Sequence, residues 1–487
     1  MDNIILFLKP ASDSRGRNIV RDFIYGCWCN GRRIGGMQMP PLNELYCATH
    51  VRNAGFNVLF VDAQYEKQRW EALIQSRFAG IAAVVLMSST QSFRADTEIL
   101  SGIKQQNSHV RTILFGSHPT FMSHYCLNHP SVDFIVLREP EETLRRLMPA
   151  LVNSGRFIPS MEGIGYRNEN GEPVINAPRS FMDMDDLPIP DRSLLPRGID
   201  YFNPVVKKMP YTTIQTSRGC PGHCIFCTAP AFYGNKYRVR SANNVLEELE
   251  NIKNLGYQEV FFRDETFTVD RKRNREICEG MIRRNLNLKW IANGRVDMID
   301  RETMRVMKKA GCHMVKFGVE SGADDILRNY KKGTVTRQAL QVFAMAREIG
   351  LDTHAHIIFG GPGETAETIN RTISFVKKLR ASNASFGILT PYPGTELFEN
   401  LSKICPDIRD GSAANMDNLH VQGFFSEKIC GIRGEDLSRH IIRAYRSFYL
   451  RPGYLMEKLR RVESLEEFLI LLTAGTKIFQ FALRGEN

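Results

Sequence analysis

The sequence lacks the features of a membrane-spanning or an exported, disulfide-bonded protein. No run of about 18 apolar residues occurs, so no membrane span is predicted. Residues 1–13 have neither a basic start nor a small-residue cleavage site, and they predict a buried strand instead of a signal peptide. The cysteine count, 11, is odd. We therefore expect no disulfide framework and a reducing, cytoplasmic location.

Internal repeats and low-complexity tracts are also missing, as is any block of Lys and Arg interleaved with aromatic residues. The net charge of +11 is compatible with nucleic acid, anionic lipid or phosphorylated ligands. Without a basic-aromatic block we expect a generally basic, solvated surface and no nucleic-acid partner. A length of 487 residues with 43% hydrophobic and 24% charged residues predicts two or three well-packed domains.

Apolar runs alternate with helical periodicity through residues 1–153, the first expected domain. Strands are predicted at 3–9, 57–62, 82–87, 111–115 and 133–136, and helices at 41–54, 93–106 and 140–153. This alternation predicts a doubly wound parallel sheet of the flavodoxin or Rossmann type. A ligand of such a sheet lies beyond the carboxyl ends of its strands, here the loops 88–93, 116–120 and 137–141.

Residues 154–203 change character and predict a linker. Asn170-Gly171 lies between two short apolar runs, which is typical of a β-hairpin. The segment 185–191 is rich in Asp and Pro and cannot form a central helix or strand.

Strand and helix patterns resume over residues 204–400, the second expected domain. Strands are predicted at 211–217, 259–262, 289–293, 314–318, 353–359 and 384–390, and helices at 242–254, 271–284, 300–310, 336–350 and 364–379. Six such units predict a partial (β/α)6 barrel with its chemistry at the carboxyl ends of the strands. Residues 401–487 predict a helical C-terminal region.

Three cysteines, Cys220, Cys224 and Cys227, follow the first barrel strand with the spacing C-x3-C-x2-C. Three thiolates on one short loop can bind three irons of a [4Fe–4S] cluster and leave the fourth iron open. A zinc site or three unrelated thiols are the alternatives. Structural zinc usually takes four ligands in two pairs, and no second C-x2-C pair is present, although His223 could supply a nitrogen.

This cysteine motif resembles the signature of the radical S-adenosylmethionine (SAM) superfamily, over about residues 211–400. Further motifs follow the next five strands, at 264–265, 293–295, 318–322, 356–365 and 391–395, so that all face one end of the barrel. The resemblance implies that the open iron binds SAM, and that one electron cleaves SAM to methionine and a 5′-deoxyadenosyl radical. The residues implied to contact SAM are Phe226, Asp264, Asn293, Arg295, Glu320, Ser321 and Gly361.

Each SAM assignment has a structural alternative. Phe226 could be a core aromatic, Glu320 a solvated helix start, and Gly361 part of a plain strand-to-helix turn. The assignments of Asp264, Asn293 and Arg295 rest on their position after strands.

The N-terminal region resembles the cobalamin-binding domain that precedes many radical SAM domains. The segments that carry the resemblance are 40–46, 54–58, 61–63, 88–92, 115–120 and 138–141, with the linker 186–191. The residues implied to contact cobalamin are Ser88, Ser89, Thr90, Gln91, Gly116, Ser117, His118 and Glu139. An ordinary polar turn is the alternative for the serine-rich segment.

The cobalt-ligating motif Asp-x-His-x-x-Gly of some cobalamin enzymes is absent. The resemblance therefore implies a cobalamin without a protein histidine on cobalt, and we interpret His118 as a loop residue beside the corrin edge. Some relatives keep this fold without binding cobalamin.

The combined resemblance implies a cobalamin-dependent radical SAM enzyme that methylates an unactivated carbon of a lipid, tetrapyrrole or secondary metabolite. It also implies a small-molecule substrate, with a hydrophobic compound as one option. An electron donor such as flavodoxin or ferredoxin is implied as well. Radical cyclisation, rearrangement or oxidation, as in hopanoid- or bacteriochlorophyll-type relatives, is one alternative. A non-catalytic cobalamin carrier or sensor is another.

The end of the chain, residues 464–483, is apolar and helical, with Lys458, Arg460, Arg461 and Lys477 nearby. We expect this helix to pack on the barrel, because most amphipathic helices face a core. A peripheral contact with a membrane surface or an apolar substrate is the alternative. Cys27 and Cys29 are expected to be packing thiols, with a minor metal or redox pair as the alternative.

Overall fold

The computed structural model describes residues 3–10, 21, 37–63, 70–152, 159–196, 201–410 and 423–484, except for the side chains of Leu73 and Arg484. These residues form two compact units, which are described separately. The first unit holds the described residues up to 21, 41–196 and 391–410; the second holds 37–40, 201–390 and 423–484.

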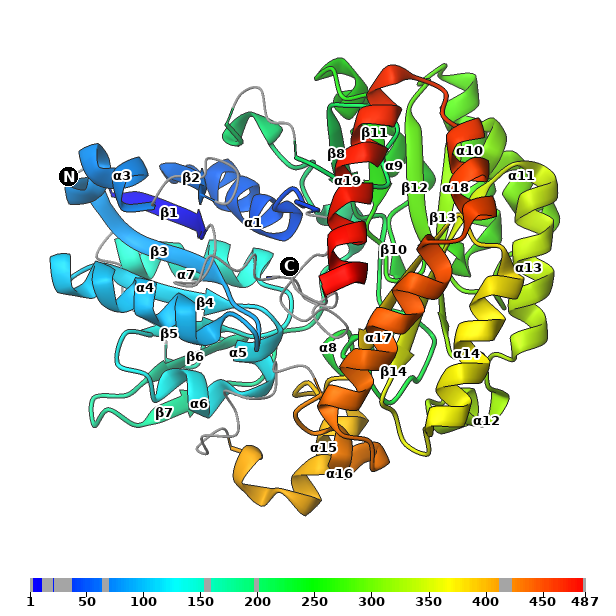
Figure 1. Cartoon of the computed structure of the whole chain (residues 1–487). Helices are drawn as coiled ribbons and strands as arrows, with labels where there is room; N and C mark the ends of the chain where they lie inside the picture. The colour runs from blue at the N-terminus through cyan, green and yellow to red at the C-terminus, as the bar shows by residue number, and fades with distance from the viewer. Residues whose placement is uncertain are drawn as a thin grey trace. The chain divides into compact units, whose positions relative to one another are not determined.

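The first unit is built on the predicted parallel sheet (Figure 1). Its parallel strands follow the order β2-β1-β3-β4-β5, and β6 and β7 extend the β5 edge as an antiparallel pair. This confirms the doubly wound sheet and the hairpin around Asn170-Gly171. The strands are β1 (Ile4–Lys9), β2 (Val58–Asp62), β3 (Ile81–Met87), β4 (Arg111–Phe115), β5 (Phe134–Val136), β6 (Ile164–Arg167) and β7 (Pro173–Ile175).

Helices cover both faces of this sheet. The chain passes from β1 to β2 on one side of the sheet and from β3 to β4 on the other. Because both crossovers are right-handed, α1 and α4 lie on opposite faces. Helix α7 packs against α1 on one face. The helices are α1 (Leu42–Asn53), α3 (Trp70–Ile74), α4 (Phe93–Gln106), α5 (Ser117–Phe121), α6 (Ser123–Leu127) and α7 (Glu141–Val152).

The Pro-rich linker forms only two short 3-10 turns, Met184–Asp186 and Arg192–Leu194. Leu42 and Tyr46 of α1 pack against Met184 and Leu187. The backbone N–H of Asp191 donates to the Thr49 hydroxyl at 2.8 Å. The linker is thus anchored on α1 through both apolar and polar contacts.

The second unit is the predicted partial barrel. All six strands are parallel, in the order β15-β14-β13-β12-β11-β8, and β8 and β15 form its two edges. A separate antiparallel pair, β9 (Ser217–Arg218) and β10 (Arg238–Val239), follows β8. The strands are β8 (Tyr211–Ile214), β11 (Glu259–Phe262), β12 (Lys289–Gly294), β13 (Cys312–Glu320), β14 (Asp352–Phe359) and β15 (Asn383–Ile388).

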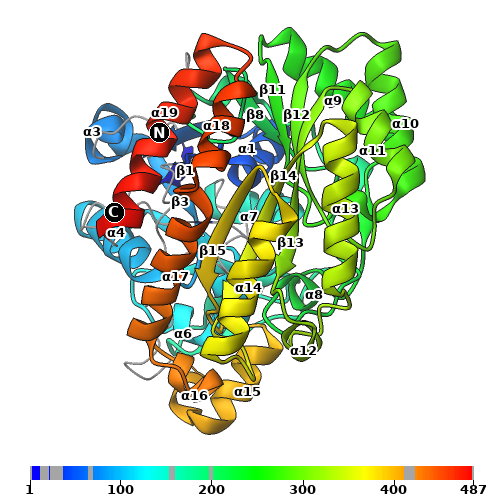
Figure 2. The same ribbon diagram turned by 45° about the vertical axis from the view of Figure 1, so that its right-hand side comes forward.

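Helices pack side by side in chain order around the outside of this sheet, as Figures 1 and 2 show. Alternate strand residues such as Phe262, Trp290 and Phe317 point outward into the main core beneath these helices. The helices are α9 (Ala242–Asn254), α10 (Arg271–Arg283), α11 (Arg301–Lys309), α13 (Thr336–Ile349), α14 (Ala366–Leu379) and α17 (Gly434–Tyr449).

The inner face of the barrel has its own apolar cluster. Phe261, Ile291 and Met314, from three neighbouring strands, pack with Met39. The backbone N–H of Gln38 donates to the carbonyl of Phe202 at 2.6 Å, which holds the 37–40 segment in place. Since Phe261, Ile291 and Met314 precede the strand ends, this cluster fills the interior below the carboxyl edge.

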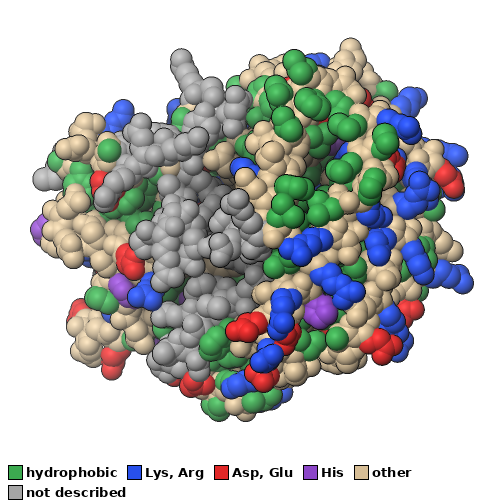
Figure 3. All heavy atoms as spheres, in the orientation of Figure 1, with side chains coloured by type: hydrophobic (Ala, Val, Ile, Leu, Met, Phe, Trp, Pro, Cys, Tyr) green, Lys and Arg blue, Asp and Glu red, His purple; other side chains and the backbone are tan. Residues whose placement is uncertain are grey.

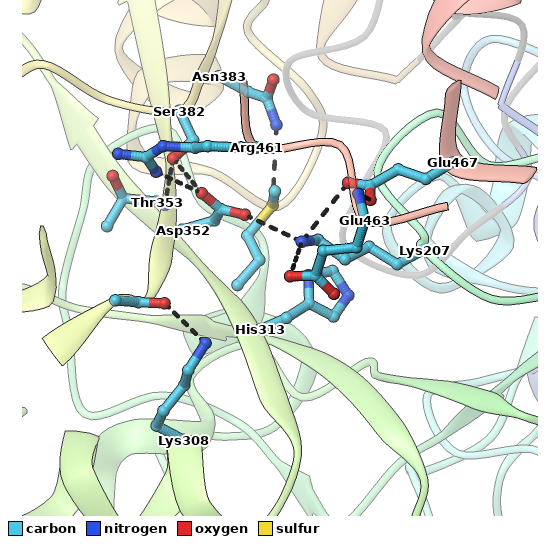
Figure 4. A network of polar contacts seen from close by, with 12 residues as sticks. Lys207, Lys308, His313, Asp352, Thr353, Ser382, Asn383, Arg461, Glu463 and Glu467 are labelled. Atoms are coloured by element: carbon cyan, nitrogen blue, oxygen red, sulfur yellow. Dashed lines mark hydrogen bonds and ion pairs between the residues drawn. The ribbon is translucent and has the colours of Figure 1, made fainter. Parts of the chain in front are cut away.

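A network of ion pairs fixes the C-terminal helices α18 (Pro452–Arg460) and α19 (Leu465–Arg484) to the opposite, amino-terminal end of the barrel. Figure 4 shows Lys207 at its centre, with its Nζ 3.2 Å from Glu463, 3.4 Å from Glu467 and 3.9 Å from Asp352. Arg461 reaches the other oxygen of Asp352 at 3.0 Å. This confirms that the tail packs on the barrel through one side.

Residues 391–410 group with the first unit, whereas the expected boundary at residue 400 assigned 391–400 to the barrel. Strand β15 ends at Ile388, and helix α15 (Glu396–Ile404) follows within this segment. The last motif identified in the sequence, 391–395, therefore lies outside the barrel unit.

Candidate active site

The cysteine motif lies on the loop between β9 and the short helix α8 (Ala229–Phe232), at the carboxyl end of β8. Gly219 has φ +91°, and a Cβ there would lie 1.9 Å from the carbonyl oxygen of Lys236. Only glycine fits this backbone path. Cys220, Cys224 and Cys227 carry free thiols and are partly exposed, whereas Cys47, Cys126, Cys278, Cys312 and Cys405 are buried.

Charged side chains of both signs lie near the thiols: Lys332, Arg295 and Glu320 near Cys224, and Glu265 near Cys227. Burial raises the pKa of Cys224, and Lys332 and Arg295 act in the opposite direction. Burial also raises the pKa of Cys227. The hydroxyl of Thr266 lies 3.4 Å from the Cys220 sulfur. Nearby cations favour thiolates, the form that binds iron.

Within the described residues, no three His, Cys, Asp or Glu side chains converge as ligands of a single metal ion. A cubic cluster does not require such convergence, because each thiolate binds a different iron. Three accessible thiols on one loop, flanked by cations, therefore fit a cluster of this type.

Asp264, which follows β11, fixes the start of the cysteine loop. Its carboxylate accepts hydrogen bonds from the Thr216 backbone N–H, the Thr216 hydroxyl and the Ser217 hydroxyl, each at 2.6 Å. Its own carbonyl oxygen accepts a hydrogen bond from the Asn293 side chain at 2.9 Å. The structure thus links the ends of β8, β11 and β12.

Glu265, the next residue, holds the loop more directly. Its Oε2 accepts the backbone N–H of Gly219 at 2.9 Å, one residue before Cys220. Burial, with Asp264 alongside, raises the pKa of Glu265 to about 8. A carboxyl group of this kind can hold or release a proton near neutral pH.

Arg295, after β12, lies against the cysteine loop. Its guanidinium donates to both carboxylate oxygens of Asp297 at 3.0 Å and to the Lys332 carbonyl at 2.7 Å. A Cβ at Gly222 would lie 2.8 Å from Arg295 Nη1 and 3.4 Å from the Cys220 sulfur. Glycine at position 222 therefore lets the guanidinium approach the thiols.

Glu320 ends β13 in the left-handed region, with φ +66°, beside a register shift between β13 and β14. Its Oε1 accepts a hydrogen bond from Lys332 Nζ at 2.7 Å. Its Oε2 is buried and has no hydrogen-bond partner in the described structure. A strained backbone and an unsatisfied buried oxygen are features of a ligand-contacting residue.

Phe226, Ser321 and Gly361 make structural contacts. The Phe226 ring packs edge-on against Tyr330, with the centroids 5.5 Å apart. A Cβ at Gly361 would lie 1.9 Å from the Tyr330 ring. Ser321 Oγ lies 3.1 Å from the Thr372 hydroxyl on α14.

Tyr330 and Glu364 connect the β14 loop to the cysteine loop. The Tyr330 hydroxyl donates to Glu364 Oε2 at 3.4 Å, and the same oxygen accepts the Gly360 N–H at 2.5 Å. The Tyr330 carbonyl accepts the backbone N–H of Ile225 at 3.1 Å. These bonds hold the second half of the cysteine loop.

In the first unit, the residues assigned to cobalamin gather around the carboxyl ends of β3 and β4. Gly116 has φ +126°, and a Cβ there would lie 2.3 Å from the Ser88 carbonyl oxygen. The two loops therefore touch, with no room for a side chain at 116. The strand order reverses between β1 and β3, which is where open α/β sheets bind ligands.

His118 is a neutral imidazole within this group. Its Nδ1 lies 3.0 Å from the Thr90 hydroxyl, while its buried Nε2 has no partner among the described residues. Burial lowers the pKa of His118 to about 3. Ser89 and Ser92 hydrogen-bond to each other in the same turn.

The remaining assigned residues surround the same edge. Gln91 is buried, and its Nε2 lies 2.5 Å from the Tyr392 hydroxyl. Ser117 begins α5, and Glu139 lies buried between β5 and α7. The backbone fold and the orphaned Nε2 of His118 fit a large polar cofactor at this edge. Cys27 and Cys29 lie outside the described residues.

Sequence reasoning missed several residues that the structure brings to these sites. Lys332 lies in the connection between α12 (Asp324–Asn329) and α13, and Tyr330 directly follows α12, so neither is at a strand end. No sequence pattern points to them. Glu265, Thr266 and Glu364 could have been found, because they lie within or beside the motifs already identified.

Comparisons with known proteins agree with this architecture. The radical SAM superfamily model matches residues 214–376, and the B12 binding domain model matches residues 35–148. An uncharacterized methyltransferase of Pyrococcus horikoshii is 32% identical over 432 residues, which cover 88% of this chain and 91% of that protein. An anaerobic magnesium-protoporphyrin IX monomethyl ester cyclase of Rubrivivax gelatinosus is 27% identical, over 96% of this chain and 81% of the cyclase.

A solved structure shares the fold. The radical SAM methyltransferase TsrM of Kitasatospora setae, with cobalamin and a [4Fe–4S] cluster bound, superposes with a TM-score of 0.69 at 19% identity. The match covers 84% of this chain and 79% of TsrM. The chain belongs to the radical SAM superfamily and carries an N-terminal B12-binding domain.

Proposed function

We propose that this protein is a cobalamin-dependent radical SAM methyltransferase that transfers a methyl group to an unactivated carbon of a small molecule. One observation carries the proposal: the same chain has three accessible thiols at the edge of a barrel and a sheet that matches the B12 binding domain. The similarity to a methyltransferase over 88% of the chain supports the reaction type. A lipid, a tetrapyrrole or a secondary metabolite is the proposed substrate class.

Cys220, Cys224 and Cys227 would hold the cluster, leaving one iron for SAM. We propose that Glu320 contacts SAM through its unpartnered Oε2, and that Arg295 and Asn293 face the same ligand. Asp264 and Ser321 would act by positioning, since their side chains bond to Thr216, Ser217 and Thr372. Phe226 and Gly361 both contact Tyr330, and through it they would shape the part of the SAM site that holds the adenine ring.

The first unit would hold cobalamin at the β3 and β4 loops, through Ser88–Ser92, Gly116–His118 and Glu139. The close contact of Gly116 with Ser88 excludes a side chain at position 116, so that a flat ring can approach the backbone there. When bound, cluster, SAM and cobalamin supply the radical and methyl-carrying chemistry that protein side chains lack. The neutral imidazole of His118 would hydrogen-bond at the corrin edge.

We further propose a cytoplasmic location and an electron donor such as flavodoxin or ferredoxin. All described cysteines are free thiols, which favours a reducing compartment. None of the described helices is both long and apolar enough to cross a membrane.

Anaerobic reconstitution with iron and sulfide, followed by measurement of 5′-deoxyadenosine and S-adenosylhomocysteine, tests the proposal. Both products together, with label from methyl-labelled SAM in the substrate, are expected. Cys224→Ala should lose the cluster and both products, while Cys278→Ala, in the buried core, should keep them. Full iron content and turnover in Cys224→Ala would refute the site.

A radical cyclase is the second candidate, because the magnesium-protoporphyrin ester cyclase matches 96% of the chain. It predicts 5′-deoxyadenosine without S-adenosylhomocysteine and no methyl label in the product. A non-catalytic cobalamin protein predicts neither product.

A further inference from the structure

The two C-terminal helices expose an unusual amount of apolar surface. Nine of the 14 large exposed hydrophobic side chains in the described structure lie between residues 455 and 483. In α19, Leu465, Leu469, Leu472, Phe479 and Leu483 are each at least half exposed. Their spacing of three to seven residues places them along one side of the helix. We call these five residues the α19 stripe.

Helix α18 extends the same apolar region. Leu455, Met456 and Leu459 are 50%, 55% and 62% exposed. Figure 3 shows hydrophobic side chains gathered over this part of the second unit, with Lys and Arg side chains beside them. Contiguous apolar patches of this kind mark interaction sites on soluble proteins.

The stripe is exposed although α19 is firmly docked. Glu466 accepts the backbone N–H of Met209 at 2.9 Å, near the helix start. Arg446 donates to the Leu483 carbonyl at 2.9 Å, near its end. Ile470, Ala474 and Ala482 are buried on the opposite side. Packing on the barrel therefore uses one side of α19, and within the described residues of this unit the stripe is exposed.

The charge around the stripe is positive. No acidic residue occurs from Phe468 to Arg484, and Lys477 and Arg460 are exposed. Of the acidic residues just before this segment, Glu467 is buried against Lys207, and Glu463, which is exposed, pairs with the same lysine. An apolar stripe flanked by exposed cations is complementary to the surface of an anionic bilayer.

A second copy of the chain fits less well. A two-fold contact along α19 would bring the Lys477 and Arg460 side chains of both copies to one interface, because such an interface uses the same surface twice. Like charges facing each other oppose such a contact, whereas anionic headgroups would neutralise them. No described helix is suited to cross the bilayer, so a contact here would lie along the surface.

We propose that the α19 stripe, with the exposed face of α18, docks the protein on the surface of an anionic lipid bilayer. The apolar side chains enter the headgroup and upper acyl region, and Lys477 and Arg460 bind anionic headgroups. The inference goes beyond the proposed reaction and does not depend on it. It would give the enzyme direct access to molecules dissolved in the membrane.

Flotation of the anaerobically reconstituted full chain with vesicles tests this docking. Binding is expected to phosphatidylcholine vesicles that contain phosphatidylglycerol, and to be weak with phosphatidylcholine alone. The double variant Leu469→Ser, Phe479→Ser should lower binding at least about tenfold, because each side chain loses an apolar contact with lipid. Lys477→Gln should lower binding to the anionic vesicles about fivefold.

Leu255→Ser with Leu340→Ser is the matched control, since both leucines are exposed on the same unit but belong to neither α18 nor α19. It should bind vesicles like the unchanged chain, and SAM cleavage should persist in all variants. Absence of binding to anionic vesicles overturns the proposal, as does an equal loss in the control. A concentration-dependent dimer that the double variant abolishes, without vesicle binding, assigns the face to a second copy instead.

Discussion

Gln91 Nε2 donates a hydrogen bond to the hydroxyl of Tyr392 at 2.5 Å, although 301 residues separate them in the chain. Gln91 follows β3, and Tyr392 follows β15 by four residues. A Cβ at Gly394 would lie 2.5 Å from the Phe121 ring, so the backbone of this segment packs closely on the first unit. The segment that follows the last barrel strand thus contributes a side chain to the loop after β3, which we propose holds cobalamin.

Tyr392→Phe should weaken cobalamin retention without abolishing SAM cleavage. The variant removes one buried hydrogen bond, worth about 1 kcal/mol, and leaves Gln91 to reorient at the loop that would hold the cofactor. We expect about a fivefold higher dissociation constant for cobalamin, measured by absorbance titration.

Tyr166→Phe, in β6 of the same unit, is the control and should bind cobalamin like the unchanged chain. Equal cobalamin affinity in Tyr392→Phe and the unchanged chain would show that the Gln91 contact does not support the cofactor.

The order of helices and strands could be predicted from the sequence, because hydrophobic periodicity differs between the two. Helices α4 and α9 begin and end at the predicted residues, and all six barrel strands were found. The cysteine loop was also accessible, since its spacing is local. Segment 391–395 groups with the first unit through contacts to Gln91 and Phe121, which are long-range and leave no local pattern in the sequence.

Contacts that cross between elements were beyond sequence reasoning. Lys332 reaches Glu320 from the α12–α13 connection, and Tyr330 reaches Glu364 from the same connection. Asp264 and Ser321 were expected to face SAM, but their oxygens bond to neighbouring hydroxyl groups. The exposure of the α19 stripe was likewise hidden, because both sides of that helix are apolar in sequence.

Lys332→Met should destabilise the protein by about 3–5 kcal/mol, because it leaves the Glu320 carboxylate buried without its cation. Adding Glu320→Gln should restore much of the lost stability, since no unpaired charge is then buried. Chemical denaturation of the parent, Lys332→Met and the double variant measures both effects.

The double variant should still fail to cleave SAM if Glu320 contacts the ligand. Recovery of stability together with full 5′-deoxyadenosine formation would limit Glu320 and Lys332 to a structural role.

Lys207→Met should loosen the C-terminal helices from the barrel. The substitution leaves Asp352 and Glu467 without the cation that their side chains share, at a cost of about 1–3 kcal/mol. Faster amide hydrogen exchange in α18 and α19 than in α13 is the expected result. Lys208→Met, at the neighbouring position, is the control; equal exchange in both variants would argue against the clamp.

Glu364 should make stability fall as pH rises. Burial raises its pKa from 4.5 to about 7 in the folded chain. Between pH 4.5 and 7 the unfolded chain has released a proton that the folded chain keeps, so increasing pH favours unfolding. Above pH 7 Glu364 is ionised in both states, so the free energy of unfolding stops falling. Its total decrease is at most on the order of 3 kcal/mol.

Glu364→Gln should remove this slope, because an amide does not titrate, yet it can still accept the Gly360 and Tyr330 hydrogen bonds. Denaturant unfolding of both proteins at pH 5 and pH 8 gives the difference. Subtracting the two profiles cancels the contribution of Glu265, whose raised pKa acts in the same direction. Glu367→Gln, exposed on α14, should keep the parent slope; a parent slope in Glu364→Gln would show that this carboxyl group ionises normally.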